Sequence, residues 1–113
     1  MGIISDFRNR QKARSVIGQI VEANTGEDCD FLASRITEEM GAIGVPVRRR
    51  SVITDPPCRE LGHVNLKNQY EHVVVEVGGR IFDPGYTERA LKPDRYLEAA
   101  YRPQPGVKVV WSD

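Results

Sequence analysis

The sequence predicts a single α+β domain over residues 1–113, with helices packed on an antiparallel sheet of about four strands. Two segments with helical spacing of apolar residues come first, at 4–23 and 26–40. A hairpin signal follows at 71–84, where two β-branched or aromatic runs flank a Gly-Gly pair. A last strand is predicted at 107–111. A chain of this length is large enough for one modest core.

The charge balance limits the classes of partner. The chain has 16 Lys and Arg against 16 Asp and Glu, so its formal net charge is zero. This argues against a main role in coating nucleic acid or an anionic membrane. No apolar run approaches the ~20 residues of a membrane span, and the charged N-terminal segment is not a signal peptide. We therefore expect a cytoplasmic location where the chain is made, although a domain cut from a longer secreted chain would look the same.

The first predicted helix, 4–23, has Ser5 as its expected N-cap. Its apolar stripe begins with Phe7 and is concentrated in the second half, up to Val21. The basic first half, from 8 to 14, is interpreted as a solvated face.

The second predicted helix carries a cysteine in its first turn. Thr25 and Asp28 have the spacing of a capping box, and Gly41 is the expected residue just past the end. Cys29 and Met40 belong to one apolar face of this helix. First-turn amides and the helix dipole favour thiolate over thiol at Cys29, and a nearby imidazole would favour it further. The competing interpretation is a small core cysteine.

The segment 42–54 is interpreted as a strand in which Pro46 indicates an edge or a first position. The arginine run 48–50 is read as a solvated part of that strand. Cys58 and His63 in the next loop form a weaker second Cys/His candidate, and a disulfide from Cys58 to Cys29 stays open for an exported chain. No zinc-binding spacing is present, so no metal is expected.

The hairpin brings an imidazole towards a carboxylate. If Gly78 and Gly79 are the whole loop, Val77 faces Arg80 and His72 becomes a diagonal neighbour of Asp83 on one face. A base held by a carboxylate is half of a nucleophilic site, and Cys29 is the available nucleophile. Beyond the hairpin we expect a turn at 83–86, a helix at 93–101 opened by Pro93, and a final strand paired with the hairpin.

Two stretches, GEDCDFLASRITEEMG and HVVVEVGGRIFDP, place a helix-start Cys before a strand-borne His and an Asp-Pro strand. Over residues 24–86 this order resembles the papain-like and transglutaminase-like superfamily, nearest to the small papain-fold domains of bacterial toxins and deamidase effectors. The resemblance implies a papain-like core with Cys29 as nucleophile, His72 as general base and acid, and Asp83 as its orienter. It also implies an oxyanion hole that uses the Cys29 amide and a side-chain donor. Gln19 and Asn24 are candidates for that donor, although neither stands at the spacing usual in the superfamily.

The activity implied is that of a cysteine-dependent amide hydrolase. Proteolysis, glutamine deamidation and transamidation share an acyl-thioester intermediate, and the sequence does not choose among them. A protein or peptide amide is the expected substrate, no cofactor is expected, and a toxin would have a cognate immunity protein as partner. The alternative is a non-catalytic binding or adaptor module of α+β fold, with Cys29 in its core.

Overall fold

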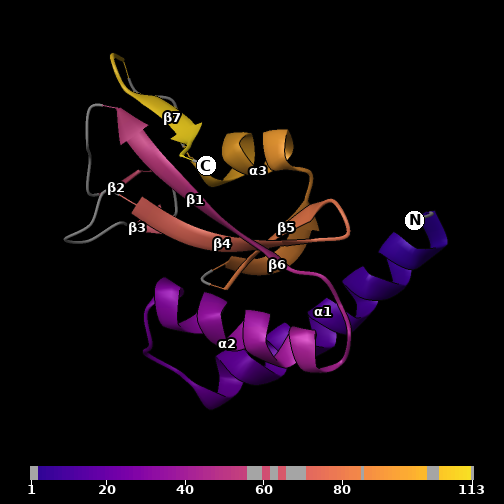
Figure 1. Cartoon of the computed structure of the whole chain (residues 1–113). Helices are drawn as coiled ribbons and strands as arrows, with labels where there is room; N and C mark the ends of the chain where they lie inside the picture. Colours follow the sequence, from indigo (N-terminus) through magenta and orange to yellow (C-terminus); the bar gives the residue numbers. More distant parts are fainter. Residues whose placement is uncertain are drawn as a thin grey trace.

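The computed structural model describes residues 3–55, 60–61, 64–65, 71–84, 86–101 and 105–112. In these ranges it has three helices, a five-stranded antiparallel sheet in the order β6-β5-β4-β1-β7, and a separate two-stranded sheet β2-β3 (Figure 1). This confirms the α+β class, with one more strand in the main sheet than expected. The elements in chain order are α1 (Ile3–Ala23), α2 (Cys29–Ala42), β1 (Arg48–Asp55), β2 (Glu60–Leu61), β3 (Val64–Asn65), β4 (Glu71–Val77), β5 (Arg80–Asp83), β6 (Tyr86–Leu91), α3 (Pro93–Ala100) and β7 (Lys108–Trp111).

The hairpin of β4 and β5 has the predicted register. Val75 pairs with Phe82, and Val77 pairs with Arg80. Gly78 and Gly79 form the whole loop, with φ of 57° and 77°. Positive φ at both central residues is the requirement of the tight turn that suits the twist of two antiparallel strands, and glycine meets it at little cost.

One face of the sheet is covered by α1 and α2 (Figure 1). Because side chains alternate along β4, Val73, Val75 and Val77 all point to this side. They pack against buried positions of the two helices, which are Ala13, Ile17, Ile20, Leu32, Ala33, Ile36 and Met40. We call this the helix-pair core.

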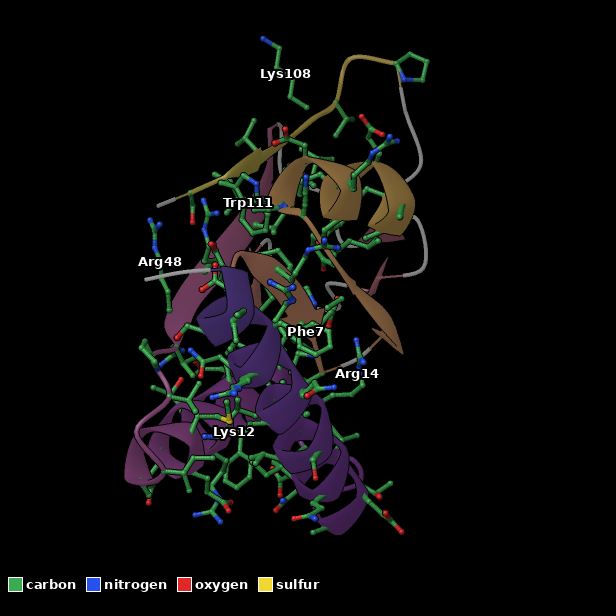
Figure 2. All side chains as sticks on the ribbon, turned by 90° about the vertical axis from the view of Figure 1, so that its right-hand side faces the viewer. Phe7, Lys12, Arg14, Arg48, Lys108 and Trp111 are labelled. Atoms are coloured by element: carbon green, nitrogen blue, oxygen red, sulfur yellow. The ribbon has the colours of Figure 1, made fainter. Side chains whose placement is uncertain are left out.

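The opposite face of the sheet carries a second core, which we call the aromatic core. Val74 and Ile81 point to it from β4 and β5. Tyr96 of α3 and Tyr101, which directly follows α3, pack there, and Trp111 of β7 lies against α3 (Figure 2). Tyr96 stacks on Trp111 with ring centroids 5.9 Å apart and meets Tyr101 edge-on at 6.3 Å. Each core uses one side-chain row of the same central strand.

Both ends of α2 differ from the prediction. Asp28 rather than Thr25 is the N-cap, and its carboxylate accepts from the Phe31 amide at 2.8 Å. The Thr25 hydroxyl instead donates to the Glu22 carbonyl, so the capping-box prediction is wrong. At the other end Gly44, with φ of 77°, takes the left-handed position expected of Gly41.

The end of α2 has the hydrogen bonds of a Schellman motif. The Val45 amide donates to the Met40 carbonyl, and the Gly44 amide donates to the Gly41 carbonyl. Gly41 is therefore inside the helix. In α1 the helix already begins at Ile3, so Ser5 lies within it and is not its cap.

The N-terminal half of α1 extends beyond the sheet (Figure 1). Phe7, the first residue of the predicted stripe, is half exposed (Figure 2), and burial starts at Ala13. Arg10 anchors this half by donating to the Gly78 carbonyl at 2.7 Å. No helix in the described ranges is both long and apolar enough to cross a membrane.

Two strand predictions need correction. β6 pairs with β5, with Asp83 opposite Tyr86, in a segment where no strand was predicted. β7 pairs with β1 rather than with the hairpin, with Trp111 opposite Val52. β6 already occupies the outer edge of β5, so the free edge for the last strand is on β1. β1 itself begins at Arg48, two residues after Pro46.

Candidate active site

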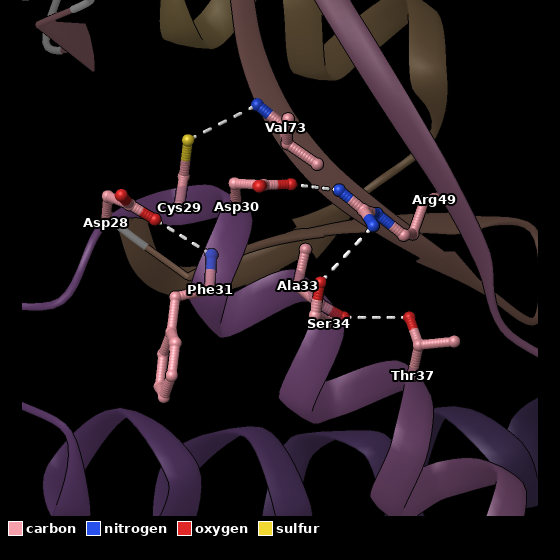
Figure 3. Close-up of polar contacts among 9 residues, drawn as sticks. All are labelled: Asp28, Cys29, Asp30, Phe31, Ala33, Ser34, Thr37, Arg49 and Val73. Atoms are coloured by element: carbon pink, nitrogen blue, oxygen red, sulfur yellow. Dashed lines mark hydrogen bonds and ion pairs between the residues drawn. The ribbon is translucent and has the colours of Figure 1, made fainter.

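Cys29 is the first residue of α2, as the sequence predicted for a first-turn cysteine. Its thiol is free and half-buried. The sulfur accepts a hydrogen bond from the Val73 amide of β4 at 3.5 Å (Figure 3). The Asp28 cap fixes the start of the helix and thereby the position of the sulfur.

The Val73 amide is available because the two hairpin strands differ in length. In a two-residue hairpin the residues that flank the turn exchange hydrogen bonds, so Val77, Val75 and Val73 all direct their amides towards β5. Pairing with β5 runs only from Val77 to Val75, and β5 ends at Asp83. The start of β4 therefore extends past β5, and Cys29 fills the place of a strand acceptor.

His72 and Asp83 form a buried pair. The His72 Nε2 lies 3.0 Å from both carboxylate oxygens of Asp83. The two side chains retain only 10% and 1% of their exposure, so water screens this pair little. The diagonal geometry predicted from the hairpin thus brings these two residues into direct contact.

A residue that the sequence analysis did not single out completes this cluster. The Tyr96 hydroxyl donates to Asp83 Oδ2 at 2.6 Å. Tyr96 is buried, and burial together with the Asp83 charge raises the pKa of its hydroxyl far above the ordinary value. It therefore stays a protonated donor. The helix α3 was predicted from Pro93, but nothing local in the sequence indicates which of its residues faces Asp83.

Contacts with His72 set the charge state of the thiol. Burial alone raises the pKa of Cys29, but hydrogen bonds from His72 and from the Val73 amide outweigh burial and bring that pKa below its ordinary value. Burial opposes the charge on His72 as well, yet hydrogen bonds to Asp83 and Cys29 raise its pKa to about 9. Both shifts act in the direction of a thiolate–imidazolium pair.

The backbone next to the sulfur offers donors to a developing oxyanion. The amides of Cys29 and Asp30 belong to the first turn of α2 and have no acceptor within the residues that the structure describes. The side-chain candidates gain no support from the geometry. The Asn24 amide nitrogen donates to the Ile20 carbonyl at the end of α1, and Gln19 is exposed on α1.

An ion pair ties the first turn of α2 to the sheet. Arg49 of β1 contacts Asp30, the residue after the cysteine, and donates to the Ser34 hydroxyl (Figure 3). Arg50 points to the other face, where it pairs with Glu76 at 3.1 Å and stacks over the Trp111 ring. Arg49 fits the predicted solvated strand, whereas Arg50 is largely covered.

The second Cys/His candidate, Cys58 with His63, lies outside the described residues. Within the described ranges no three His, Cys, Asp or Glu side chains are grouped so that they could hold a metal ion. Comparisons of the chain with models of protein families, with curated proteins and with solved structures found no match.

Proposed function

We propose that this protein is a cysteine-dependent amide hydrolase that acts through an acyl-thioester. The observation that carries the proposal is the cluster at the start of β4, where His72 contacts Asp83 at 3.0 Å and the Cys29 sulfur accepts from the amide of Val73, the residue next to His72. Each member alone has a structural explanation. Together they supply a nucleophile, its base and an orienting carboxylate, which is the logic of a catalytic triad.

In the proposed first half-reaction, the Cys29 thiolate attacks an amide carbonyl carbon. A C–S bond forms, and the carbonyl π electrons move to oxygen, which the first-turn amides of α2 can receive. When the tetrahedral intermediate collapses, the C–N bond breaks and the leaving amine takes a proton from the His72 imidazolium. The product is a thioester on Cys29, and Asp83 holds the imidazole in place throughout.

In the second half-reaction, His72 removes a proton from water as the water attacks the thioester. The C–S bond breaks, and a carboxylic acid leaves while the thiolate–imidazolium pair is restored. If an amine attacks in place of water, the same chemistry gives transamidation. The resemblance to small papain-fold effectors supports a glutamine side chain or a peptide bond of a protein as substrate. It also supports a cognate immunity protein as partner, and delivery as part of a larger chain.

The test is alkylation with iodoacetamide between about pH 4 and 9, with the modified residue identified by mass spectrometry. We expect Cys29 to label rapidly well below the ordinary thiol pKa of about 8.5. The His72→Ala variant should lose this labelling at low pH. Cys58 in the same molecule serves as an internal reference thiol.

Two outcomes count against the enzyme. One is labelling of Cys29 that follows an ordinary thiol, and the other is labelling at Cys58 alone. Either result would leave a non-catalytic α+β module as the better description. A reactive Cys29 would justify a search with glutamine-containing peptides, in which released ammonia reports deamidation and new termini report proteolysis.

A further inference from the structure

We propose that Tyr96 is a positioning residue of this site, which fixes the Asp83 carboxylate so that Asp83 holds His72 against Cys29. This inference rests on the proposed function and extends it to α3, a part of the chain outside the resemblance to papain-like proteins. Tyr96 touches neither the nucleophile nor the base in any described hydrogen bond, so its action must pass through Asp83.

The hydroxyl of Tyr96 lies 2.6 Å from Asp83 Oδ2, while His72 Nε2 lies 3.0 Å from both Asp83 oxygens. A hydroxyl donor to a carboxylate makes a short and strong hydrogen bond. It opposes rotation of the carboxylate about its last side-chain bond, and that rotation would disturb the two 3.0 Å contacts with the imidazole.

Packing leaves the Tyr96 side chain little freedom to move. It is 2% exposed, and its ring stacks on Trp111 while meeting Tyr101 edge-on. Trp111 is in turn covered by the Arg50 guanidinium, 4.2 Å from the ring centre. A donor whose rotamer is fixed by packing on several sides is what precise positioning of a reactive group requires.

The Asp83 side chain is almost fully buried, and a buried carboxylate stays ionised only with donors around it. The Tyr96 hydroxyl supplies one such donor, to the Oδ2 atom that His72 also contacts. Without the Tyr96 donor, the Asp83 carboxylate orients the His72 imidazole less well. The interaction with His72, which offsets the effect of burial on the pKa of Cys29, is then weakened.

The chain offers a matched control. Tyr101 is also buried, belongs to the same aromatic core and has the same side chain. Its hydroxyl makes no hydrogen bond of ordinary geometry within the described residues. Tyr96→Phe and Tyr101→Phe therefore each remove one buried hydroxyl, but only the first removes a donor to Asp83.

The experiment measures two quantities, the pH midpoint of Cys29 alkylation and the thermal midpoint of unfolding. Both are measured in the wild-type protein, in the single variants Tyr96→Phe, Tyr101→Phe and Asp83→Asn, and in the double variant of Tyr96→Phe with Asp83→Asn. We expect Tyr96→Phe to raise the alkylation midpoint by about one pH unit, which slows labelling about tenfold below it. Tyr101→Phe should leave the midpoint in place. In the Asp83→Asn background, Tyr96→Phe should add no further shift, because the coupled residues act as a unit.

The inference is overturned if Tyr96→Phe leaves the midpoint unchanged, if both tyrosine variants shift it equally, or if the Tyr96 effect persists in Asp83→Asn. If Cys29 of the wild-type protein is alkylated with the pH profile of an ordinary thiol, the proposed function itself is contradicted. Failure of the inference about Tyr96 and failure of the proposed function are therefore distinguishable. Should Tyr96→Phe not fold, the hydroxyl proton of Tyr96 can be followed by NMR in the intact protein. A slowly exchanging resonance that disappears in Asp83→Asn supports the bond, and its absence in wild type contradicts it.

Discussion

Two ionisable residues of the candidate site, the half-buried Cys29 and the buried His72, have pKa values that shift against the effect of burial. Burial disfavours both the thiolate and the imidazolium, so neither charge would persist alone. Each is stabilised by the other, and the imidazolium is stabilised further by Asp83. The charged pair therefore depends on three residues, and removal of Asp83 should change the titration of both Cys29 and His72.

The sign of the His72 shift predicts how stability depends on pH. Its folded pKa, about 9, lies above its ordinary 6.5. The native state therefore binds more protons than the unfolded state between these values, and the stability that His72 contributes is complete below about pH 6.5 and lost as pH rises. To remove the thiol titration, Cys29→Ser should be compared with the double variant of Cys29→Ser and His72→Gln by urea unfolding.

In the Cys29→Ser background, Asp83 alone raises the pKa of His72. The pH range over which the stability from His72 is lost therefore begins near 6.5 and ends below 9. The difference in unfolding free energy between the two proteins should shrink by about 1.4 kcal/mol for each unit by which the folded pKa still exceeds 6.5. A difference that stays constant across this window would contradict the raised pKa of His72.

Among the elements, the β4–β5 turn has a second function beyond reversing the chain. A Cβ at Gly78 would lie 2.7 Å from the Asp6 carbonyl oxygen and 2.8 Å from the Arg10 Cγ, while a Cβ at Gly79 would meet nothing within 4 Å. Gly78 is therefore the place where α1 rests on the hairpin. Both glycines have positive φ, so a comparison of the two separates contact from backbone strain.

We expect Gly79→Ala to cost about 1 to 2 kcal/mol, the price of a left-handed residue that is not glycine. Gly78→Ala should cost clearly more, because the methyl group must also push the Asp6 backbone away and weaken the Arg10 contact. Urea unfolding of both variants gives the difference. Equal losses of unfolding free energy in the two variants would mean that the contact between α1 and Gly78 does not limit the side chain at that position.

The same hairpin shows why part of the site was predictable. The Gly-Gly pair fixes the register through local backbone chemistry, and the register alone places His72 beside Asp83. The start of α2 was less certain because Thr25 and Asp28 are both good caps within one turn. In the structure the Thr25 hydroxyl donates to the Glu22 carbonyl at the end of α1, and Asp28 caps α2. Residue spacing does not reveal which of the two residues becomes the cap.

Other features depended on which elements share an edge or a face. β7 joined β1 because β6 had taken the outer edge of β5, and β6 itself carried no recognised strand signal. Tyr96 reaches Asp83 only once α3 lies across the sheet, opposite the helix pair. Such contacts follow from tertiary packing, so periodicity and turn residues could not predict them.

On the scale of the whole molecule, the candidate site joins the two faces of one sheet. Cys29 packs with the helix-pair core, whereas His72 and Asp83 lie on the face of the aromatic core, towards Tyr96. The sulfur reaches β4 where that strand extends past β5. An intact site therefore requires both layers to be docked on β4 at once, and we expect the two cores to unfold together.

Two probes can test this cooperativity, because Trp111 is the single tryptophan and lies by the aromatic core, while two of the three helices lie on the other face. We expect tryptophan fluorescence and far-ultraviolet circular dichroism to give coincident urea transitions. Val74→Ala and Val75→Ala are matched perturbations, since both side chains are fully buried neighbours on β4 that face opposite cores. Each should cost about 2 kcal/mol and shift both probes equally. A variant that shifted the urea transition of one probe alone would show that one layer can unfold separately from the other. Cys29 and His72 would then be able to separate without global unfolding.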